Sequence, residues 1–313
     1  MKAFYCDTYD LPLPRNHRFP MAKYRKLRQR LVDSDEPGDG PGDGSGDGLE
    51  FVLPPALSNE QIALAHDRDY IEKASTGRLS QEMIRALGFP WSMQLVERSR
   101  RSAGATAMAL KSSVTDGVSV NLAGGTHHAH HDRPQGFCLF NDSVIAARMW
   151  QQSGLGRSPL IIDCDVHQGN GTASILENDC SIFTFSMHCE KNFPVTKALS
   201  DLDIPLEIGC DDETYLNALA LGLERIPQLF EADCVIYVAG ADPYEGDRLG
   251  KLSLTKSGLA DRDRLVFEFC RKYHLPCAVS MAGGYAHDVD QIVDIHFNTV
   301  KTAQAFSSHS FGV

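Results

Sequence analysis

Residues 160–167 have the sequence Leu-Ile-Ile-Asp-Cys-Asp-Val-His, an apolar run that becomes polar at its end. Such a run is typical of a buried strand that leads into a functional loop. Because side chains alternate along a strand, we expect Asp163, Asp165 and His167 to share one face. An isolated Asp-x-Asp is more often a capping or turn carboxylate. The added histidine and the glycines that follow it favour a metal site.

Four other short apolar runs show the same pattern, at residues 117–125, 181–189, 234–240 and 277–285. Amphipathic stretches of helical length are found at residues 142–152, 213–230, 257–274 and 288–306, and we expect further helices at residues 21–32 and 58–74. Strand and helix alternate along the chain. The sequence therefore predicts an α/β fold, a single domain over residues 1–313 with a central, mostly parallel sheet flanked by helices.

Three Gly-Asp-Gly repeats follow one another within residues 37–48. Such a segment cannot bury apolar surface, so we expect a flexible insertion at about residues 35–48 within the one domain. A weak calcium site is the alternative interpretation, because calcium loops are rich in Asp and Gly. The spacing matches neither an EF-hand nor the nonapeptide repeat, which favours a surface loop.

The composition limits the function classes that need to be considered. The chain has 313 residues, 42% of them hydrophobic, and a formal charge of -11. This acidic balance argues against nucleic-acid binding and weakly favours a cationic substrate. The absence of any long apolar run predicts a cytoplasmic protein with no membrane partner. The 9 cysteines include no Cys-x-x-Cys pair and are expected to be reduced and buried. Nothing in the sequence sets the oligomeric state.

A second polar strand end supplies Asp242, directly after an apolar run. An ionised carboxylate in such a place needs a partner if it is buried, and a shared cation would provide one. Since the carboxyl ends of parallel strands meet at one edge, we expect Asp242 to join Asp165 and His167. Two carboxylates and a neutral imidazole leave zinc an open position for water or substrate. Iron or another divalent ion would accept the same ligands.

Two further strand ends carry groups suited to proton transfer and charge stabilisation. His127 and His128 follow one apolar run, and an imidazole can accept and return a proton near neutral pH. A His-rich surface loop is the alternative, and for His130 and His131 it is the interpretation we favour. Tyr285 follows two glycines at another strand end. It is either a packed core tyrosine or a hydroxyl that stabilises negative charge on a carbonyl oxygen.

These motifs occur together and in a fixed order along the chain: Gly124-Gly125-Thr126-His127-His128, Gly136-Phe137-Cys138, Asp163-x-Asp165-x-His167-Gln-Gly-Asn170-Gly, Ala-Asp242-Pro and Gly-Gly-Tyr285. Taken together they resemble the zinc-dependent histone deacetylase family. The likeness begins near residues 17–21 and continues to the final helix. The His-Gln-Gly-Asn-Gly motif is most similar to the class IV branch and its bacterial relatives. The resemblance implies an arginase-deacetylase fold with a narrow channel that descends to the metal.

The resemblance also implies a role for each matching residue. His128 corresponds to the general base that activates water, and His127 to the neighbour that supports charge and helps to protonate the leaving amine. Tyr285 corresponds to the hydroxyl that polarises the acyl carbonyl. The implied zinc ligands are the three residues already singled out, Asp165, His167 and Asp242.

Around these groups the resemblance implies a substrate channel and one departure from the family pattern. Gly136, Phe137 and Phe193 correspond to the channel walls around an acyl-lysine stem, with the Gly136 carbonyl directed towards the substrate amide. Asn170 stands behind His128 where the best-known branch of the family has an aspartate. An amide stabilises an imidazolium less than a carboxylate does, so we expect a lower pKa for the base.

A second cation is implied by the resemblance alone. Asp163 corresponds both to the partner of His127 and to a residue of a potassium site, to which Ser186 would also contribute. The implied cofactors are therefore zinc and potassium.

The expected activity is hydrolysis of a linear amide in an acylated amine. The channel residues Phe137 and Phe193 favour acetyl or longer acyl groups on the ε-amine of lysine in proteins or peptides. Small acetylated amines such as polyamines carry the same amide bond and remain the alternative. An inactive acyl-lysine-binding protein is disfavoured because Tyr285 and both histidines are present. A binuclear, arginase-like hydrolase would need another carboxylate where Pro243 and Tyr244 stand.

Overall fold

The computed structural model describes residues 1–9, 11–14, 17–35 and 48–307. Its centre is an eight-stranded sheet with the order β2-β1-β3-β8-β7-β4-β5-β6, in which every paired strand is parallel. The α/β fold and the parallel sheet that the sequence predicts are thus confirmed. The strands are β1 (Lys2–Phe4), β2 (Glu50–Val52), β3 (Val118–Asn121), β4 (Pro159–Asp163), β5 (Phe183–Cys189), β6 (Leu202–Leu206), β7 (Cys234–Val238) and β8 (Cys277–Ser280).

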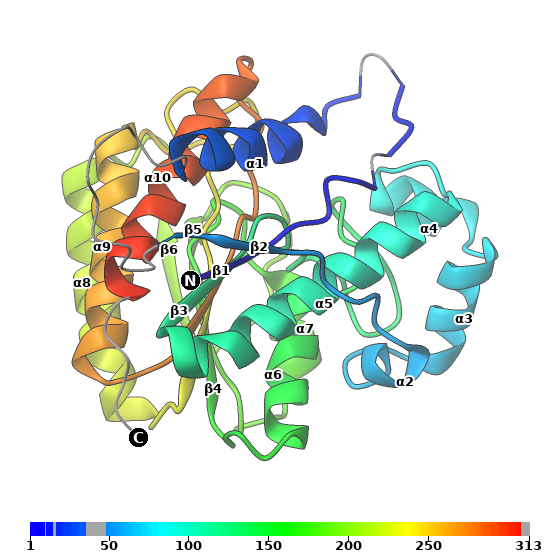
Figure 1. Ribbon diagram of the computed structural model, residues 1–313, viewed down its shortest axis with the longest axis horizontal. Coiled ribbons are helices and arrows are strands. Elements are labelled where there is room, and N and C mark those ends of the chain that lie inside the picture. Colours follow the sequence, from blue (N-terminus) through cyan, green and yellow to red (C-terminus); the bar gives the residue numbers. More distant parts are fainter. Residues whose placement is uncertain (10, 15–16, 36–47, 308–313) are drawn as a thin grey trace.

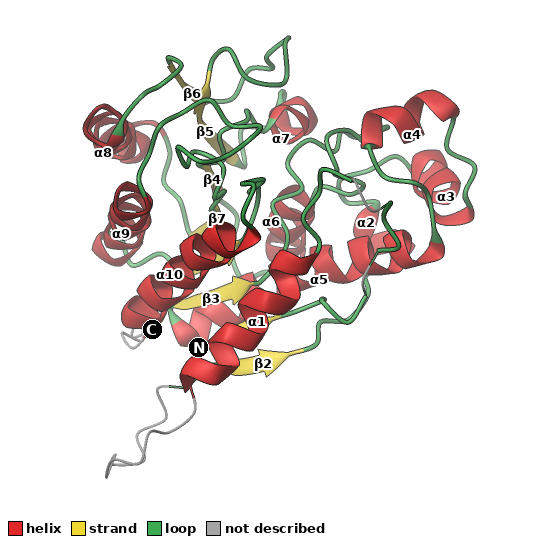
Figure 2. Ribbon diagram, turned by 90° about the horizontal axis from the view of Figure 1, so that it is seen from above, coloured by secondary structure: helices red, strands yellow, loops and turns green. Residues whose placement is uncertain are grey.

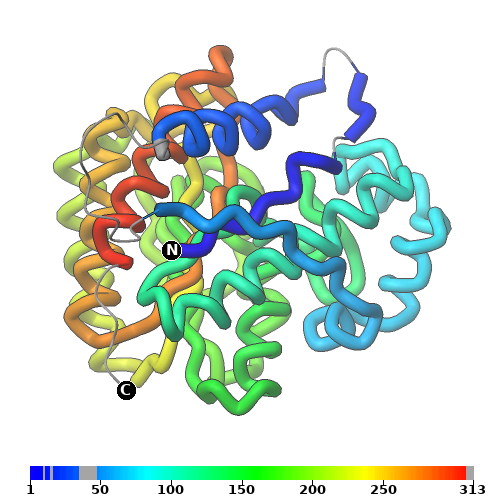
Figure 3. The backbone as a smooth tube through the Cα atoms, in the orientation of Figure 1, coloured from blue at the N-terminus to red at the C-terminus, as the bar shows by residue number. Residues whose placement is uncertain are grey.

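Helices cover both faces of this sheet (Figure 2). One layer contains α8 (Asp212–Leu229), α9 (Lys256–Lys272) and α10 (Val289–Ser307), with α1 (Ala22–Asp35) packed on α10. The blue tube of α1 can be followed beside the orange and red α10 in Figure 3. The opposite layer contains α5 (Met93–Asp116), α6 (Asp142–Gln152) and α7 (Asn170–Leu176). Beyond α5 lie α2 (Asn59–Ile62), α3 (Arg68–Thr76) and α4 (Gln81–Leu87) (Figure 1).

The central strands are buried on both faces, which explains why their sequences are almost continuously apolar. In β4, Leu160 and Ile162 belong to the hydrophobic cluster on one side, whereas Ile161 belongs to the cluster on the other. In β7, Tyr237 and Ile236 divide in the same way. Because both faces are filled by packed side chains, polar groups are accommodated at the strand ends.

The boundaries of several elements differ from the expected ones. Residues 58–74 form two helices because Ser58 and Gln61 make a capping box that starts α2, and the Asp67 side chain accepts from Tyr70 N to start α3. Three strands, β1, β2 and β6, were not expected at all. The predicted Gly- and Asp-rich insertion, with its calcium alternative, falls almost entirely at residues 36–47, outside the described residues. No helix in the described part of the chain has the length and apolar composition needed to span a bilayer.

Candidate metal centre and its surroundings

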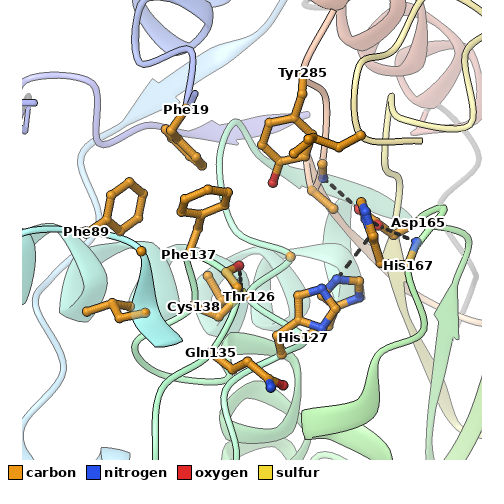
Figure 4. A pocket seen from close by; sticks show the side chains of 18 of the residues that line it. Phe19, Phe89, Thr126, His127, Gln135, Phe137, Cys138, Asp165, His167 and Tyr285 are labelled. Atoms are coloured by element: carbon orange, nitrogen blue, oxygen red, sulfur yellow. Dashed lines mark hydrogen bonds and ion pairs between the residues drawn. The ribbon is translucent and has the colours of Figure 1, made fainter. Parts of the chain in front are cut away.

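Three buried side chains converge at the carboxyl edge of the sheet. One ligand atom from each of Asp165, His167 and Asp242 lies within 4.8 Å of the others. Nδ1 of His167 is 3.0 Å from Oδ1 of Asp165 and 3.2 Å from Oδ2 of Asp242. The structure therefore brings together the three residues that the sequence identifies as candidate ligands, and Asp165 and His167 are visible in Figure 4.

A turn after strand β4 produces this arrangement. The prediction that Asp163, Asp165 and His167 share one face of a strand is therefore wrong. Strand β4 ends at Asp163, and Asp165 and His167 belong to the loop that follows. Oδ1 of Asp163 accepts a hydrogen bond from Asp165 N at 3.1 Å, and Oδ1 of Asp165 accepts from His167 N at 2.9 Å. Each aspartate thus bonds the backbone two residues on, which curls the chain. As a result Asp163 is directed towards His127, away from the candidate ligands.

Backbone amides from neighbouring loops hold the two ligand carboxylates. Gly283 N donates to Oδ2 of Asp165 at 2.8 Å, and Val166 N donates to Oδ1 of Asp242 at 3.0 Å. Oδ2 of Asp242 is buried and accepts no hydrogen bond from the described residues. A Cβ at Gly283 would lie 1.8 Å from this oxygen, so only glycine leaves the space open. A divalent cation fits this donor set, because it would coordinate the oxygen that His167 approaches but that no hydrogen bond satisfies.

The electrostatics of the cluster also favour a cation. Burial disfavours the charged imidazole of His167, but the carboxylates of Asp165 and Asp242 outweigh burial and raise its pKa to about 10. Burial, together with the negative charge of Asp165, raises the pKa of Asp242 to about 7. Both pKa shifts indicate that two buried carboxylates at this spacing stabilise a positive charge placed between them.

His127 and His128 lie side by side next to the cluster, with ring centroids 4.1 Å apart. Nδ1 of His127 is 2.7 Å from Oδ2 of Asp163. Burial opposes the charged form of His127, but Asp163 and then Asp165 raise its pKa to about 9. Burial, followed by positive charge on His127 and His167, lowers the pKa of His128 well below its usual value. One imidazole is therefore a proton donor and its neighbour a neutral acceptor.

The amide of Asn170 fixes which nitrogen of His128 carries the proton. Asn170 Nδ2 donates to Oε1 of Gln135 at 2.8 Å and lies 3.2 Å from Nε2 of His130, which leaves Oδ1 facing His128 Nδ1 at 2.7 Å. Nδ1 of His128 is therefore the donor and Nε2 the acceptor. His130 is buried in this network, so the prediction that it is a surface residue is wrong. His131 is exposed, as expected.

Tyr285 lies opposite the histidines and is nearly buried. Its backbone is held on both sides, because Tyr285 N donates to Oδ2 of Asp247 at 2.6 Å and Arg248 Nε donates to the Tyr285 carbonyl at 2.6 Å. Burial, reinforced by nearby carboxylates, raises the pKa of the Tyr285 hydroxyl well above its usual value, so the group remains a hydrogen-bond donor. Lys23 is buried nearby and donates to the Ala282 carbonyl at 3.1 Å. No pattern in the sequence distinguished Lys23 from the other residues of its helix.

A cavity of about 610 Å³ connects this cluster with the solvent. The predicted channel residues Gly136, Phe137 and Phe193 all line it. Gly136 has φ +54, and a Cβ there would meet His128 Cδ2 at 2.6 Å, so glycine is needed for both reasons. Its carbonyl accepts a weak hydrogen bond from Cys138 Sγ at 3.2 Å.

Phe19, Phe89 and Phe137 form one aromatic wall of the cavity, seen in Figure 4, and Phe193 stands apart from it. The ring centroid of Phe137 lies 5.1 Å from that of Phe89 and 5.3 Å from that of Phe19, and Phe193 lies 4.9 Å from His128. Phe19 and Phe89 were missed as channel residues. Phe19 belongs to residues 17–21, where the likeness to the family begins, and this was the feature of the sequence that could have identified it as a channel residue.

Asp163 and Ser186 are register partners on the adjacent strands β4 and β5. The two oxygens of Asp163 are occupied by the Asp165 amide and His127, and Ser186 Oγ lies 3.0 Å from His188 Nδ1. The structure therefore brings the two candidate potassium residues onto neighbouring strands, each with a protein partner.

Comparison with known proteins agrees with this geometry. The histone deacetylase domain model matches residues 17–300. The chain belongs to the histone deacetylase family. An uncharacterized protein of Picosynechococcus sp. is 41% identical over 293 residues, covering 93% of this chain and 94% of that protein. Histone deacetylase 2 of Arabidopsis thaliana is 27% identical over 306 residues, covering 94% of this chain and 76% of that protein.

Solved structures of histone deacetylase homologues share the fold. An HDAC homologue complexed with SAHA has a TM-score of 0.80 at 24% identity, and the match covers 96% of this chain and 83% of the homologue's chain. An HDAC homologue from Aquifex aeolicus has a TM-score of 0.79 at 23% identity, with the same two coverages. This family member therefore has the arginase-deacetylase fold and is a hydrolase that acts on amides, as its motifs predicted.

Proposed function

We propose that this histone deacetylase family member is a zinc-dependent amidohydrolase that removes acyl groups, acetyl or longer, from the ε-amine of lysine in proteins or peptides. The observation that carries the proposal is the convergence of His128 and Tyr285 on the three-ligand cluster at the inner part of an aromatic-walled cavity. A long, unbranched lysine stem fits between aromatic walls, which exclude water from the bond to be cleaved.

Asp165, His167 and Asp242 would hold the zinc ion, as two carboxylates and one imidazole suit that metal and leave a position open. When bound, zinc supplies Lewis acidity, which acidifies a water and polarises a carbonyl. The donor set alone also suits iron, so metal analysis of the purified protein decides between them.

The remaining chemistry belongs to side chains of this chain. His128 Nε2, the unprotonated nitrogen, takes a proton from the attacking water. The Tyr285 hydroxyl donates a hydrogen bond to the acyl oxygen as negative charge develops there. His127, held in its charged form by Asp163, gives a proton to the departing amine. Water and the amide thus yield a carboxylate and a free lysine amine.

The proposed potassium site would use Asp163 and Ser186, whose register on adjacent strands supports a shared ligand role. A cation there would lie behind His127 and reduce the pull of Asp163 on the imidazole proton. Titration of activity with KCl against NaCl at constant ionic strength tests this role.

Two alternatives differ in what they require of the site. A protein that only binds acyl-lysine would not need the acid–base pair, yet His127 and His128 have opposite pKa shifts suited to proton transfer. A deacetylase of small acetylated amines needs a cavity mouth that tolerates positive charge. The exposed residues Arg18, Arg85 and Lys251 line the mouth here and oppose it.

The decisive assay offers the zinc-loaded protein acyl-lysine peptides of increasing acyl-chain length beside acetylated polyamines. Turnover of the peptides, abolished by a chelator and restored by zinc, is the expected result. Turnover of polyamines alone would overturn the proposal, and activity unaffected by metal removal would overturn the zinc assignment.

A further inference from the structure

Three basic side chains surround the outer end of the cavity. Arg18, Arg85 and Lys251 line it and are exposed, so they lie where it opens to solvent. They come from three separate segments: the stretch before α1, helix α4, and the loop between β7 and α9. No single sequence pattern links them, and only the fold brings them to one opening.

Each of the three belongs to a segment that lies beside a different part of the channel wall. Arg85 belongs to the last turns of α4, where the next two carbonyls, at residues 86 and 87, accept from Gly136 N and Phe137 N. Lys251 Nζ donates to the Lys191 carbonyl at 2.8 Å, two residues before Phe193.

On the third side, Arg18 directly precedes the wall residue Phe19. Arg248 Nη2 donates to the Arg18 carbonyl at 3.1 Å, and Nε of the same arginine donates to the carbonyl of Tyr285. The segments that carry the three cations are thus held against the channel wall or next to it, and the Lys251 ammonium group itself is bonded.

Within the described part of the chain, no ion pair neutralises the charge at the opening. Arg18, Arg85 and Lys251 form no ion pair with any described residue. Among the described residues that line the cavity, Asp165 is the only acidic one, and it is a buried candidate ligand. In a chain with a net charge of -11, three unpaired cations at one opening are the opposite of what the overall composition predicts.

We propose that the mouth formed by Arg18, Arg85 and Lys251 recognises carboxylates next to the acylated lysine, so that the preferred substrate has an acyl-lysine flanked by aspartate or glutamate. This inference rests on the proposed lysine deacylase function and specifies its substrate. The acyl-lysine stem occupies the aromatic channel, so the residues on either side of it remain at the opening, within reach of the three cations. Basic flanks and free polyamines are repelled.

The test uses acetyl-lysine peptides that differ only in the two flanking residues, Glu, Gln or Lys, and the zinc-loaded full chain. We expect kcat/KM to fall in the order Glu, Gln, Lys, by about threefold to tenfold at each step, and the differences to shrink at high salt. Arg85→Gln and Lys251→Gln each reduce the Glu-over-Gln ratio. Arg225→Gln, an exposed change of the same charge on α8, leaves the ratio unchanged.

A second pair of peptides ends in acetyl-lysine, one with a free and one with an amidated carboxyl end. Comparing their rates shows whether a terminal carboxylate is recognised as well as a side-chain carboxylate. Equal rates for Glu and Gln flanks, or faster cleavage of Lys flanks, would overturn the inference and leave the deacylase function intact. If no acyl-lysine peptide is cleaved, the proposed function fails. In that case the same peptides carry a fluorescent label, and their binding affinities, measured by fluorescence anisotropy, decide the charge preference.

Discussion

Oδ1 of Asn170 lies 2.7 Å from Nδ1 of His128, and the two donors of the Asn170 amide face Gln135 and His130 on its other side. This orientation makes the imidazole an acceptor at Nε2 without placing a negative charge behind it. A carboxylate at the same position would hold a proton on His128 more firmly.

Asn170→Asp therefore raises the pKa of His128. We expect the acidic limb of the kcat/KM profile to move to higher pH by about one unit, because the new carboxylate stabilises the imidazolium. Zinc content and thermal unfolding are measured alongside to exclude damage to the fold. Asn298→Asp, an exposed change on α10, is the matched control. An unmoved acidic limb in a folded Asn170→Asp protein would show that His128 is not the base.

Removal of the metal destabilises the protein, because the buried carboxylates Asp165 and Asp242 then lose a divalent counter-charge, and a single proton on His167 replaces only part of it. With zinc in large excess over its dissociation constant, we expect a chelator to lower Tm by roughly 5–10 °C. Asp242→Asn binds less zinc and loses this response. Asp261→Asn, at a half-buried aspartate of α9 that pairs with Arg264 and lies outside the metal cluster, retains it. Full zinc content and activity in Asp242→Asn would contradict the ligand assignment.

Tyr285→Phe removes one hydrogen-bond donor from the acyl oxygen and leaves the metal ligands in place. Loss of one such donor lowers kcat by about 100-fold to 1,000-fold, whereas KM and zinc content stay close to those of the parent. Steady-state kinetics and metal analysis separate these quantities. Tyr273→Phe, at a more exposed tyrosine, is expected to have no effect. A Tyr285→Phe enzyme with normal kcat would exclude a catalytic role for the hydroxyl.

The chemistry of the site could be predicted from the sequence better than its local geometry. Asp165, His167 and Asp242 follow buried strands, and parallel strands bring their carboxyl ends to one edge whatever the loop conformations are. The turn after Asp163 could not be foreseen, because side-chain bonds to the backbone compete with strand continuation and leave no mark on the hydrophobic pattern. His130 was misplaced for a related reason: tertiary hydrogen bonds bury it.

Short elements and isolated buried charges escaped prediction for other reasons. Strands β1 and β2 have three residues each, too few to show a periodic pattern. Lys23 lies in a helix with many basic residues, and its burial depends on packing against Ala282, more than 250 positions away. The cations at the cavity mouth are equally invisible in sequence, because three distant segments contribute them.

His66 makes stability depend on pH. Its Nδ1 donates to the His130 carbonyl at 2.8 Å and its Nε2 accepts from Asn141 N at 2.8 Å, and the acceptor role of Nε2 requires the neutral ring. Burial lowers the pKa of His66 to about 4. Below its unfolded pKa of about 6.5 the unfolded chain takes up a proton that the folded chain refuses. The contribution of His66 to the free energy of unfolding is therefore complete above pH 6.5 and declines as the pH falls towards 4.

Urea denaturation measured from pH 7.5 to pH 4 checks this behaviour. We expect His66 to contribute a loss of about 3 kcal/mol in the free energy of unfolding across the window. His66→Gln is less stable at neutral pH, yet its stability declines less steeply with acid. His287→Gln, at an exposed histidine, retains the full slope. Parallel slopes for the parent and His66→Gln would refute the assignment.

Two of the three cations at the cavity mouth belong to parts of the chain that hold no metal ligand. Arg18 and Arg85 lie outside every segment that supplies a ligand, whereas Lys251 shares the loop between β7 and α9 with Asp242. A change at either arginine therefore leaves the segments that supply the metal ligands unaltered. A library randomised at positions 18 and 85 would sample new sequence preferences against an unchanged catalytic background. Related proteins with this fold can therefore acquire a different substrate preference through a few substitutions at the surface.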